Sequence, residues 1–224
     1  MNTNSKVDVK KLSVLAMLSA VACLVMITIQ ISLMPAAPFL KYDPKDIIIV
    51  IGGFIYGPLA VIPMSIIVSF VEMFTVSADG LVGFVMNVLS SLAFACPAAF
   101  IYRRKRTLKG AVTGLVAGWL FVTIVMVLWN YIITPGYRGI PREAIIPLLP
   151  TVFAPFNLIK YGFSAAAAML LYKPLSKTLK KMKIIEGNET GAPSKENAAA
   201  GVVLAVCLAA IPIILLILVL QGII

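Results

Sequence analysis

Residues 153–162, FAPFNLIKYG, place an amide and an ammonium group inside a run of otherwise apolar side chains. Asn157 and Lys160 are three residues apart, so on a helix they share one face. A cation in a segment suited to a lipid bilayer is costly, and it needs an ionic partner, a water-lined cavity or a ligand. This stretch therefore predicts one wall of a binding pocket inside a bundle of membrane-embedded helices.

The composition of the chain indicates the same class of fold. Of its 224 residues, 61% are hydrophobic and 12% are charged, and the charges cluster between long apolar runs. This distribution is typical of polytopic α-helical membrane proteins, whereas the alternating ten-residue segments of a membrane barrel are absent. We predict an all-α fold, a polytopic bundle of six core transmembrane helices followed by a seventh, C-terminal helix.

Breaks in the apolar pattern divide the chain into three parts. The six core spans are expected within residues 1–183, a polar linker at 184–197, and the additional transmembrane helix within 198–224. This last run is long enough to cross a bilayer by itself, at about 1.5 Å of rise per residue. The expected spans are residues 12–34, 47–56, 60–76, 81–102, 111–133, 151–172 and 198–220.

The basic residues predict how the bundle is oriented. With the N-terminus in the cytoplasm, 14 of the 19 lysine and arginine residues fall in inner segments and 4 in outer loops, with Lys160 as the remaining one. Cytoplasmic segments of membrane proteins are enriched in these residues. We therefore expect a multi-pass protein with a cytoplasmic N-terminus. Because the basic residues lie at helix ends, the net charge of +10 does not indicate nucleic-acid binding.

Sequence features of common catalytic sites are missing. The chain has no histidine, which removes the Ser-His-Asp arrangement and the commonest metal ligand. Its three cysteines lie in separate apolar runs without metal-ligand spacing, and no glycine-rich stretch has the Lys-Ser/Thr context of a phosphate loop. We expect no enzymatic activity and no resident cofactor or metal, and the chain cannot couple ATP hydrolysis by itself.

Polar side chains gather near the predicted outer ends of the spans. At 1.5 Å per residue, Asn157 and Lys160 lie roughly 9–14 Å below the outer end of their span, and Asn87 and Glu72 lie at comparable depths. Asn130 lies near the outer end of the fifth span. A few fixed polar groups between aromatic walls are typical of a site for a flat, partly polar molecule. Asp46 completes the polar set, and the aromatic residues at similar levels are Phe39, Tyr42, Trp129, Tyr131, Phe156 and Tyr161.

Each of these residues also has a simpler structural interpretation. Asn157 could hydrogen-bond a neighbouring helix, and Lys160 could extend its ammonium group to the membrane interface. Glu72 could form a structural ion pair with Lys160 or another cation, because a buried carboxylate without a cation would protonate. An interfacial position is the alternative for Phe39, Tyr42, Asn130 and Tyr131.

Three motifs in a fixed order resemble a known family. Residues 38–58, PFLKYDPKDIIIVIGGFIYGP, lead into the second span, residues 129–137, WNYIITPGY, close the fifth, and FNLIKYG lies in the sixth. In this order and spacing they are similar to the riboflavin-specific substrate-binding subunit, or S component, of energy-coupling factor (ECF) transporters. The resemblance covers about residues 10–183, and the seventh run departs from the six spans of that family.

The resemblance implies a function and a set of partners. It implies a subunit of the bacterial cell membrane that captures riboflavin from outside, as a transported ligand. It also implies a shared module of one transmembrane coupling protein and two ATP-binding subunits. Ala16 and Ala20 resemble the AxxxA motif that packs on the coupling protein, although ordinary packing within the bundle is the alternative.

The resemblance also implies roles for residues of the pocket. The segment 39–46 resembles the loop that covers the substrate in this family, and Leu40 would pack on the flavin ring. Asn130, Asn157 and Lys160 match positions expected to hydrogen-bond the flavin. The complete set of expected substrate-binding residues is Phe39, Leu40, Tyr42, Asp46, Asn87, Asn130, Tyr131, Asn157 and Lys160.

Other functions stay open at this point. Within the same family, the ligand could be a different vitamin or precursor. A membrane-embedded enzyme acting on a lipid or isoprenoid would need paired carboxylates for a metal, which Glu72 alone does not supply. A purely structural assembly subunit is the remaining alternative.

Overall fold

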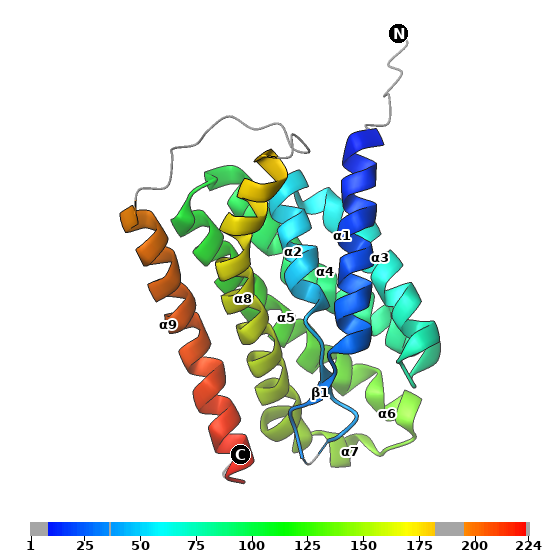
Figure 1. Cartoon of the computed structure of the whole chain (residues 1–224). Coiled ribbons are helices and arrows are strands. Elements are labelled where there is room, and N and C mark those ends of the chain that lie inside the picture. Colours follow the sequence, from blue (N-terminus) through cyan, green and yellow to red (C-terminus); the bar gives the residue numbers. More distant parts are fainter. Residues whose placement is uncertain (1–8, 36, 182–194, 223–224) are drawn as a thin grey trace.

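The computed structural model describes residues 9–35, 37–181 and 195–222. Long helices run side by side through the molecule (Figure 1). In the described part of the chain, six helical segments are long and apolar enough to cross a membrane. The principal helices are α1 (Val9–Thr28), α2 (Lys45–Tyr56), α3 (Pro58–Thr75), α4 (Gly80–Lys105), α5 (Leu108–Ile132), α8 (Ala154–Lys181) and α9 (Lys195–Leu220).

Helix α2 is too short to cross a membrane by itself. Its 12 residues cover about 18 Å at 1.5 Å per residue, against a hydrocarbon thickness of about 30 Å. It packs against α1, α3, α4 and α8, and Figure 1 shows it confined to one half of the bundle. Gly57, with φ 93°, lets the chain turn from α2 directly into α3. The N-terminal end of α2 therefore starts inside the protein.

A short hairpin precedes α2. Strands β1 (Ile31–Ser32) and β2 (Lys41–Tyr42) pair antiparallel, with Ile31 opposite Tyr42. The predicted first span, which continued to residue 34, is wrong at this end because α1 stops at Thr28. Residues 29–34 continue the apolar character of α1, so the sequence predicted a longer helix. Ile31 and Ser32 instead form β1, whose backbone pairs with β2.

The connection from α5 to α8 is helical in short pieces. It contains α6 (Thr134–Arg138), α7 (Arg142–Ile145) and a π-helical turn, η1 (Leu149–Phe153), which leads into α8. Figure 1 shows α6, α7 and the hairpin at the same end of the bundle. This end, opposite the basic connection between α4 and α5, is called the hairpin end below.

Helices α4 and α5 approach each other most closely where α5 carries glycine. A Cβ added at Gly114 would lie 2.6 Å from the carbonyl oxygen of Ala98, so no larger side chain fits there. Small residues allow such close backbone contact between membrane helices. The two helices therefore form a tightly joined pair.

Helix α9 lies along α8. At Gly162 an added Cβ would be 2.9 Å from Pro212 of α9, so the two helices are in close contact there. Near the hairpin end, Val219 is buried in an apolar cluster with Leu33, Met34 and Ile159. The expected linker at 184–197 lies mostly outside the described residues, and α9 begins at Lys195. The seventh helix thus contacts both the core of the bundle and the segment around the hairpin.

Candidate functional site

A buried network of charged side chains lies at the start of α2. Lys160 is 6% exposed, and its ammonium group donates to Asp43 Oδ2 at 2.8 Å. Lys45 Nζ lies 3.5 Å from the same oxygen and donates to Glu72 Oε2 at 2.5 Å. The network joins α3, α8 and the loop before α2, and it provides the ionic partners that buried charges require. Lys160 therefore does not extend to the membrane interface, and the cation beside Glu72 is Lys45.

Asp43, in the loop between β2 and α2, is shared by both ammonium groups. Burial by itself raises the pKa of the Asp43 carboxyl, but Lys160 and Lys45 outweigh this effect and hold the pKa at about 2. Asp43 is therefore ionised at neutral pH. It fixes the segment that leads into α2 to the second turn of α8.

Asp46, the next carboxylate along the chain, has a different environment. The Ser91 hydroxyl of α4 donates to Asp46 Oδ1 at 2.5 Å. Its other oxygen, Oδ2, is buried and has no hydrogen-bond partner among the described residues. Leaving a buried acceptor unsatisfied costs on the order of 1–3 kcal/mol. An additional donor to this oxygen would therefore be favourable, and a bound molecule is one possible source.

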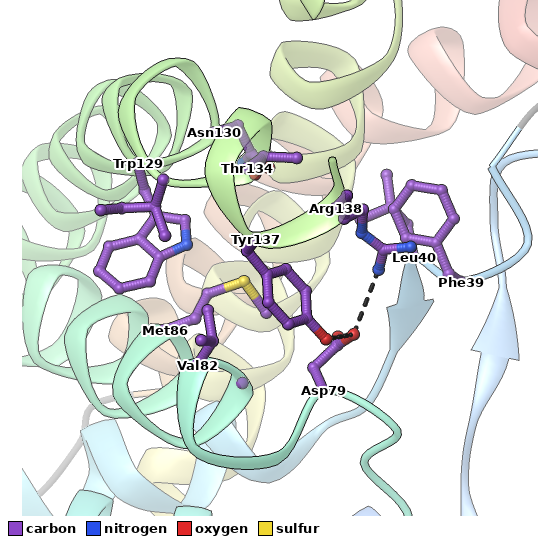
Figure 2. A pocket seen from close by; sticks show the side chains of 12 residues that line it. Phe39, Leu40, Asp79, Val82, Met86, Trp129, Asn130, Thr134, Tyr137 and Arg138 are labelled. Atoms are coloured by element: carbon purple, nitrogen blue, oxygen red, sulfur yellow. Dashed lines mark hydrogen bonds and ion pairs between the residues drawn. The ribbon is translucent and has the colours of Figure 1, made fainter. Parts of the chain in front are cut away.

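A small, partly enclosed cavity lies at the hairpin end of the bundle, between α4, α5, α6 and the segment after β1 (Figure 2). Its volume is about 50 Å³, which is well below the roughly 300 Å³ or more of a typical small-molecule site. The cavity is therefore too small for a vitamin in this structure. The residues that line it are Phe39, Leu40, Asp79, Val82, Gly83, Met86, Trp129, Asn130, Ile133, Thr134, Tyr137 and Arg138.

Contacts between two loops and helix α6 lie at the mouth of this cavity. Tyr137 Oη donates to Asp79 Oδ1 at 2.7 Å, and Arg138 Nη2 donates to the same oxygen at 3.2 Å. The Arg138 guanidinium also lies 4.1 Å from the centre of the Phe39 ring. Figure 2 shows Arg138 between Phe39 and Asp79. We call this set of four residues the mouth contacts.

Several of the predicted binding residues come together at these two places. Phe39, Leu40 and Asn130 line the cavity, whereas Asp46 and Lys160 belong to the buried polar region at the start of α2. Leu40 connects the two, because it also packs against the apolar cluster that contains Phe156 and Ile159 of α8. The segment carrying Leu40 thus lies between the cavity and the helix that carries Asn157 and Lys160.

The two buried amides bond locally. Asn157 Nδ2 donates to the Phe153 carbonyl at 2.7 Å, and Asn130 Nδ2 donates to the Met126 carbonyl at 2.7 Å. Asn130 Oδ1 accepts from the hydroxyl of Thr134 at 3.0 Å. Within the described residues, the only hydrogen bond of Asn157 is to its own helical segment, and Asn130 bonds to α5 and to α6, which follows it directly. The alternative that Asn157 serves as a bond between helices therefore lacks support.

Three further predicted residues lie outside the cavity lining. Tyr131 is 37% exposed, with Arg142 5.2 Å from its ring, because adjacent residues on a helix point about 100° apart. Asn87 is half-buried, and its neighbour Met86 lines the cavity in its place. Tyr42 packs edge-on against Phe163 of α8, with ring centres 6.3 Å apart.

Sequence reasoning missed several residues of this region. Lys45 was expected among the charges of an outer loop, but its side chain is fully buried because the short α2 begins inside the bundle. Asp43 was not singled out, and neither were the mouth contacts Asp79, Tyr137 and Arg138. One sequence feature could have indicated the buried charges. In the stretch KYDPKD at 41–46, four of six residues are charged, and an apolar run follows directly.

Comparison with known proteins identifies the family. A family profile described as "ECF transporter, substrate-specific component" matches residues 10–172. The chain belongs to this family. As an ECF S component with several apolar helices, it is a multi-pass membrane protein, and the predicted all-α membrane bundle is confirmed. Helix α9 lies beyond the matched residues.

Named relatives of this S component are transporters. It is 31% identical over 180 residues to "Riboflavin transporter RibU" of Staphylococcus aureus, covering 77% of this chain and 94% of the relative. It is 32% identical over 161 residues to "Riboflavin transporter FmnP" of Bacillus subtilis, covering 68% and 84%. A solved structure titled "Structure and mechanism of the S component of a bacterial ECF transporter" superposes with a TM-score of 0.66 at 29% identity, covering 76% of this chain and 98% of that one.

The AxxxA pair of α1 faces outward in this S component. Ala16 and Ala20 are exposed, and the buried face of α1 is formed instead by Val14, Leu15, Leu18, Ser19, Ala22 and Met26. The two alanines therefore do not pack inside this chain, and the surface around them is free for another helix to approach closely.

Proposed function

We propose that this S component binds riboflavin at the hairpin end of its bundle. The observation that carries the proposal is the arrangement around Leu40. On one side of Leu40 is a cavity lined by Trp129 and Asn130, and on the other is an apolar cluster with Phe156 and Ile159 of α8. Asn157 and Lys160 lie on the adjoining face of the same helix. If the segment with Leu40 shifts, a planar molecule can occupy the space between the cavity and α8. The names of the relatives support riboflavin as that molecule.

The chemistry of riboflavin suits these walls. The isoalloxazine ring is flat, with carbonyl acceptors along one edge, and the ribityl chain carries hydroxyl groups. Amides such as Asn130 and Asn157 can both donate and accept, and Lys160 can donate. Phe39, Leu40 and Trp129 supply apolar and aromatic surface for the ring. Asp46 Oδ2 is an acceptor suited to a hydroxyl group.

The proposal includes an orientation and partners. The hairpin end faces outside, because the basic connection between α4 and α5 lies at the opposite end and basic residues favour the cytoplasm. The N-terminus of α1 is then cytoplasmic. The ligand is handed to a shared module of one coupling protein and two ATP-binding subunits, with the exposed Ala16 and Ala20 facing the coupling protein.

A fluorescence titration tests the ligand. Purified protein in detergent, freed of ligand by washing, should quench the fluorescence of riboflavin with a dissociation constant below micromolar. Thiamine and biotin, added as competitors in large excess, should leave the quenching unchanged. Riboflavin binding no tighter than micromolar would show that the ligand is wrong, and displacement by another vitamin would identify a replacement.

A further inference from the structure

A second hollow lies on the outer surface of the bundle, away from the candidate ligand site. It is a groove of about 460 Å³ with an almost wholly apolar lining, formed by the start of α3 and the adjoining faces of α4 and α5. It shares no lining residue with the cavity beneath the hairpin. Two of its phenylalanines are half exposed, Phe100 at 48% and Phe121 at 50%. The full lining is Pro58, Leu89, Leu92, Ala93, Cys96, Pro97, Phe100, Phe121 and Val125.

Two guanidinium groups lie at one end of this groove. Arg104 is placed over the ring of Phe100, with 4.4 Å from its Cζ to the ring centre. A Cβ added at Gly57 would be 3.2 Å from Arg103 Nη1, so the Arg103 side chain lies beside the residue that precedes Pro58. Both arginines are exposed. In the part of the chain that the structure describes, neither forms an ion pair with a carboxylate.

The dimensions of the groove match one leaflet of a bilayer. From Leu89 to Phe100 the axis of α4 rises about 17 Å at 1.5 Å per residue, close to half of the roughly 30 Å hydrocarbon thickness. The arginines lie one turn beyond Phe100, near the end of α4. Guanidinium groups favour phosphate, which they can bind with two parallel hydrogen bonds.

We propose that this groove binds one acyl chain of an anionic phospholipid, with the lipid phosphate held between Arg103 and Arg104. Basic pockets between membrane helices at the cytoplasmic side are suited to anionic headgroups. A helix of a partner protein is a poorer occupant, because close helix packing favours small residues and the bulky, half-exposed Phe100 and Phe121 line the groove. The α4–α5 pair is thereby a lipid-contacting face.

Native mass spectrometry of the full chain tests this site. The probes are dioleoyl phosphatidylglycerol and dioleoyl phosphatidylcholine, which share their acyl chains and differ in charge. The wild type should retain one phosphatidylglycerol more tightly than phosphatidylcholine. In R103Q/R104Q that affinity should fall about 30-fold, since each basic residue near an anionic lipid surface contributes about a factor of five.

The matched control is K105Q/K109Q, which removes the same charge from the same connection. Lys105 packs at the start of α5, beside Gly110, and Lys109 lies outside the groove lining. This control should keep the preference for phosphatidylglycerol. A third variant, C96W, fills the groove and should lose lipid of either headgroup while its elution volume and circular dichroism match the wild type.

Three outcomes would overturn the proposal. Equal retention of the two lipids would show that the arginines do not recognise the charged headgroup. Equal losses of phosphatidylglycerol affinity in the two charge variants would show that the lipid is attracted by the general positive charge of this connection. A dimer in place of the bound lipid would assign the groove to a second copy of the chain. If C96W unfolds, the two charge variants still test the proposal, because they alter exposed residues only.

Discussion

The ion pair between Lys160 and Asp43 makes the sharpest prediction, because both side chains are buried and their roles can be separated. In K160M, Asp43 keeps only Lys45, whose ammonium lies 3.5 Å away and is already bonded to Glu72 at 2.5 Å. Breaking a buried ion pair by removing one partner costs about 3–5 kcal/mol. For a chain of this size that corresponds to a fall in Tm of roughly 6–20 °C.

The double variant K160M/D43N distinguishes stability from ligand binding. Replacing both partners with neutral groups removes the unpaired charge. The amide introduced at position 43 can still accept the backbone N–H of Lys45 through its oxygen, as the Asp43 carboxylate does at 3.3 Å. The Tm should therefore recover most of the loss seen in K160M. Riboflavin affinity should not recover, because Lys160 is proposed to contact the flavin.

Thermal unfolding in detergent and fluorescence titration with riboflavin measure the two quantities on the same samples. A Tm of K160M indistinguishable from that of the wild type would show that the ion pair does not form. A double variant with wild-type affinity would remove Lys160 from the riboflavin site and leave it a structural role. The single variant D43N, with Lys160 intact, completes the thermodynamic cycle.

Three further predictions concern the mouth, the cavity and α1. Asn130→Ala should weaken riboflavin binding by about 5- to 150-fold, because losing a buried hydrogen bond costs about 1–3 kcal/mol. The control Tyr131→Ala, at the exposed neighbouring position, should change the affinity far less in the same titration. Asp79→Asn should speed riboflavin association and dissociation in stopped-flow measurements by up to about fivefold, because a partly exposed ion pair contributes at most about 1 kcal/mol; unchanged rates would mean that the mouth contacts do not control entry. Ala16→Leu with Ala20→Leu should abolish copurification with the coupling protein and spare riboflavin affinity, and intact copurification would place that interface elsewhere.

The order of the helices could be predicted from the sequence, because a long apolar run in lipid must satisfy its backbone hydrogen bonds internally and therefore forms a helix. The ends of the helices could not be predicted equally well. Residues 29–34 continue the apolar character of α1, but β1 within them pairs with β2, and that partner is chosen by tertiary structure. The segment between the spans predicted at 111–133 and 151–172 contains α6 and α7, because proline at the start of a short helix does not prevent that helix from forming.

The candidate site shows a similar division. Leu40 and Asn130 were predicted, and the structure places them in one cavity. Lys45 looked like a solvated loop charge, since nothing local indicates that α2 starts inside the bundle. The pairing of Asp79 with Arg138 joins residues 59 positions apart, and no periodic pattern links them. Contacts of this kind depend on how loops meet, which hydropathy does not encode.

The glycine contacts between α4 and α5 determine where this S component can move. Where two backbones touch, as Gly114 and Ala98 do, neither helix can slide without losing the packing of a whole interface. If riboflavin binds at the proposed site, its entry should be a local event at the hairpin end, opposed by the mouth contacts. The barrier to uptake should depend weakly on bilayer stiffness, and the lipid-embedded helices can keep an unchanged surface toward the proposed coupling protein while the binding site exchanges its ligand.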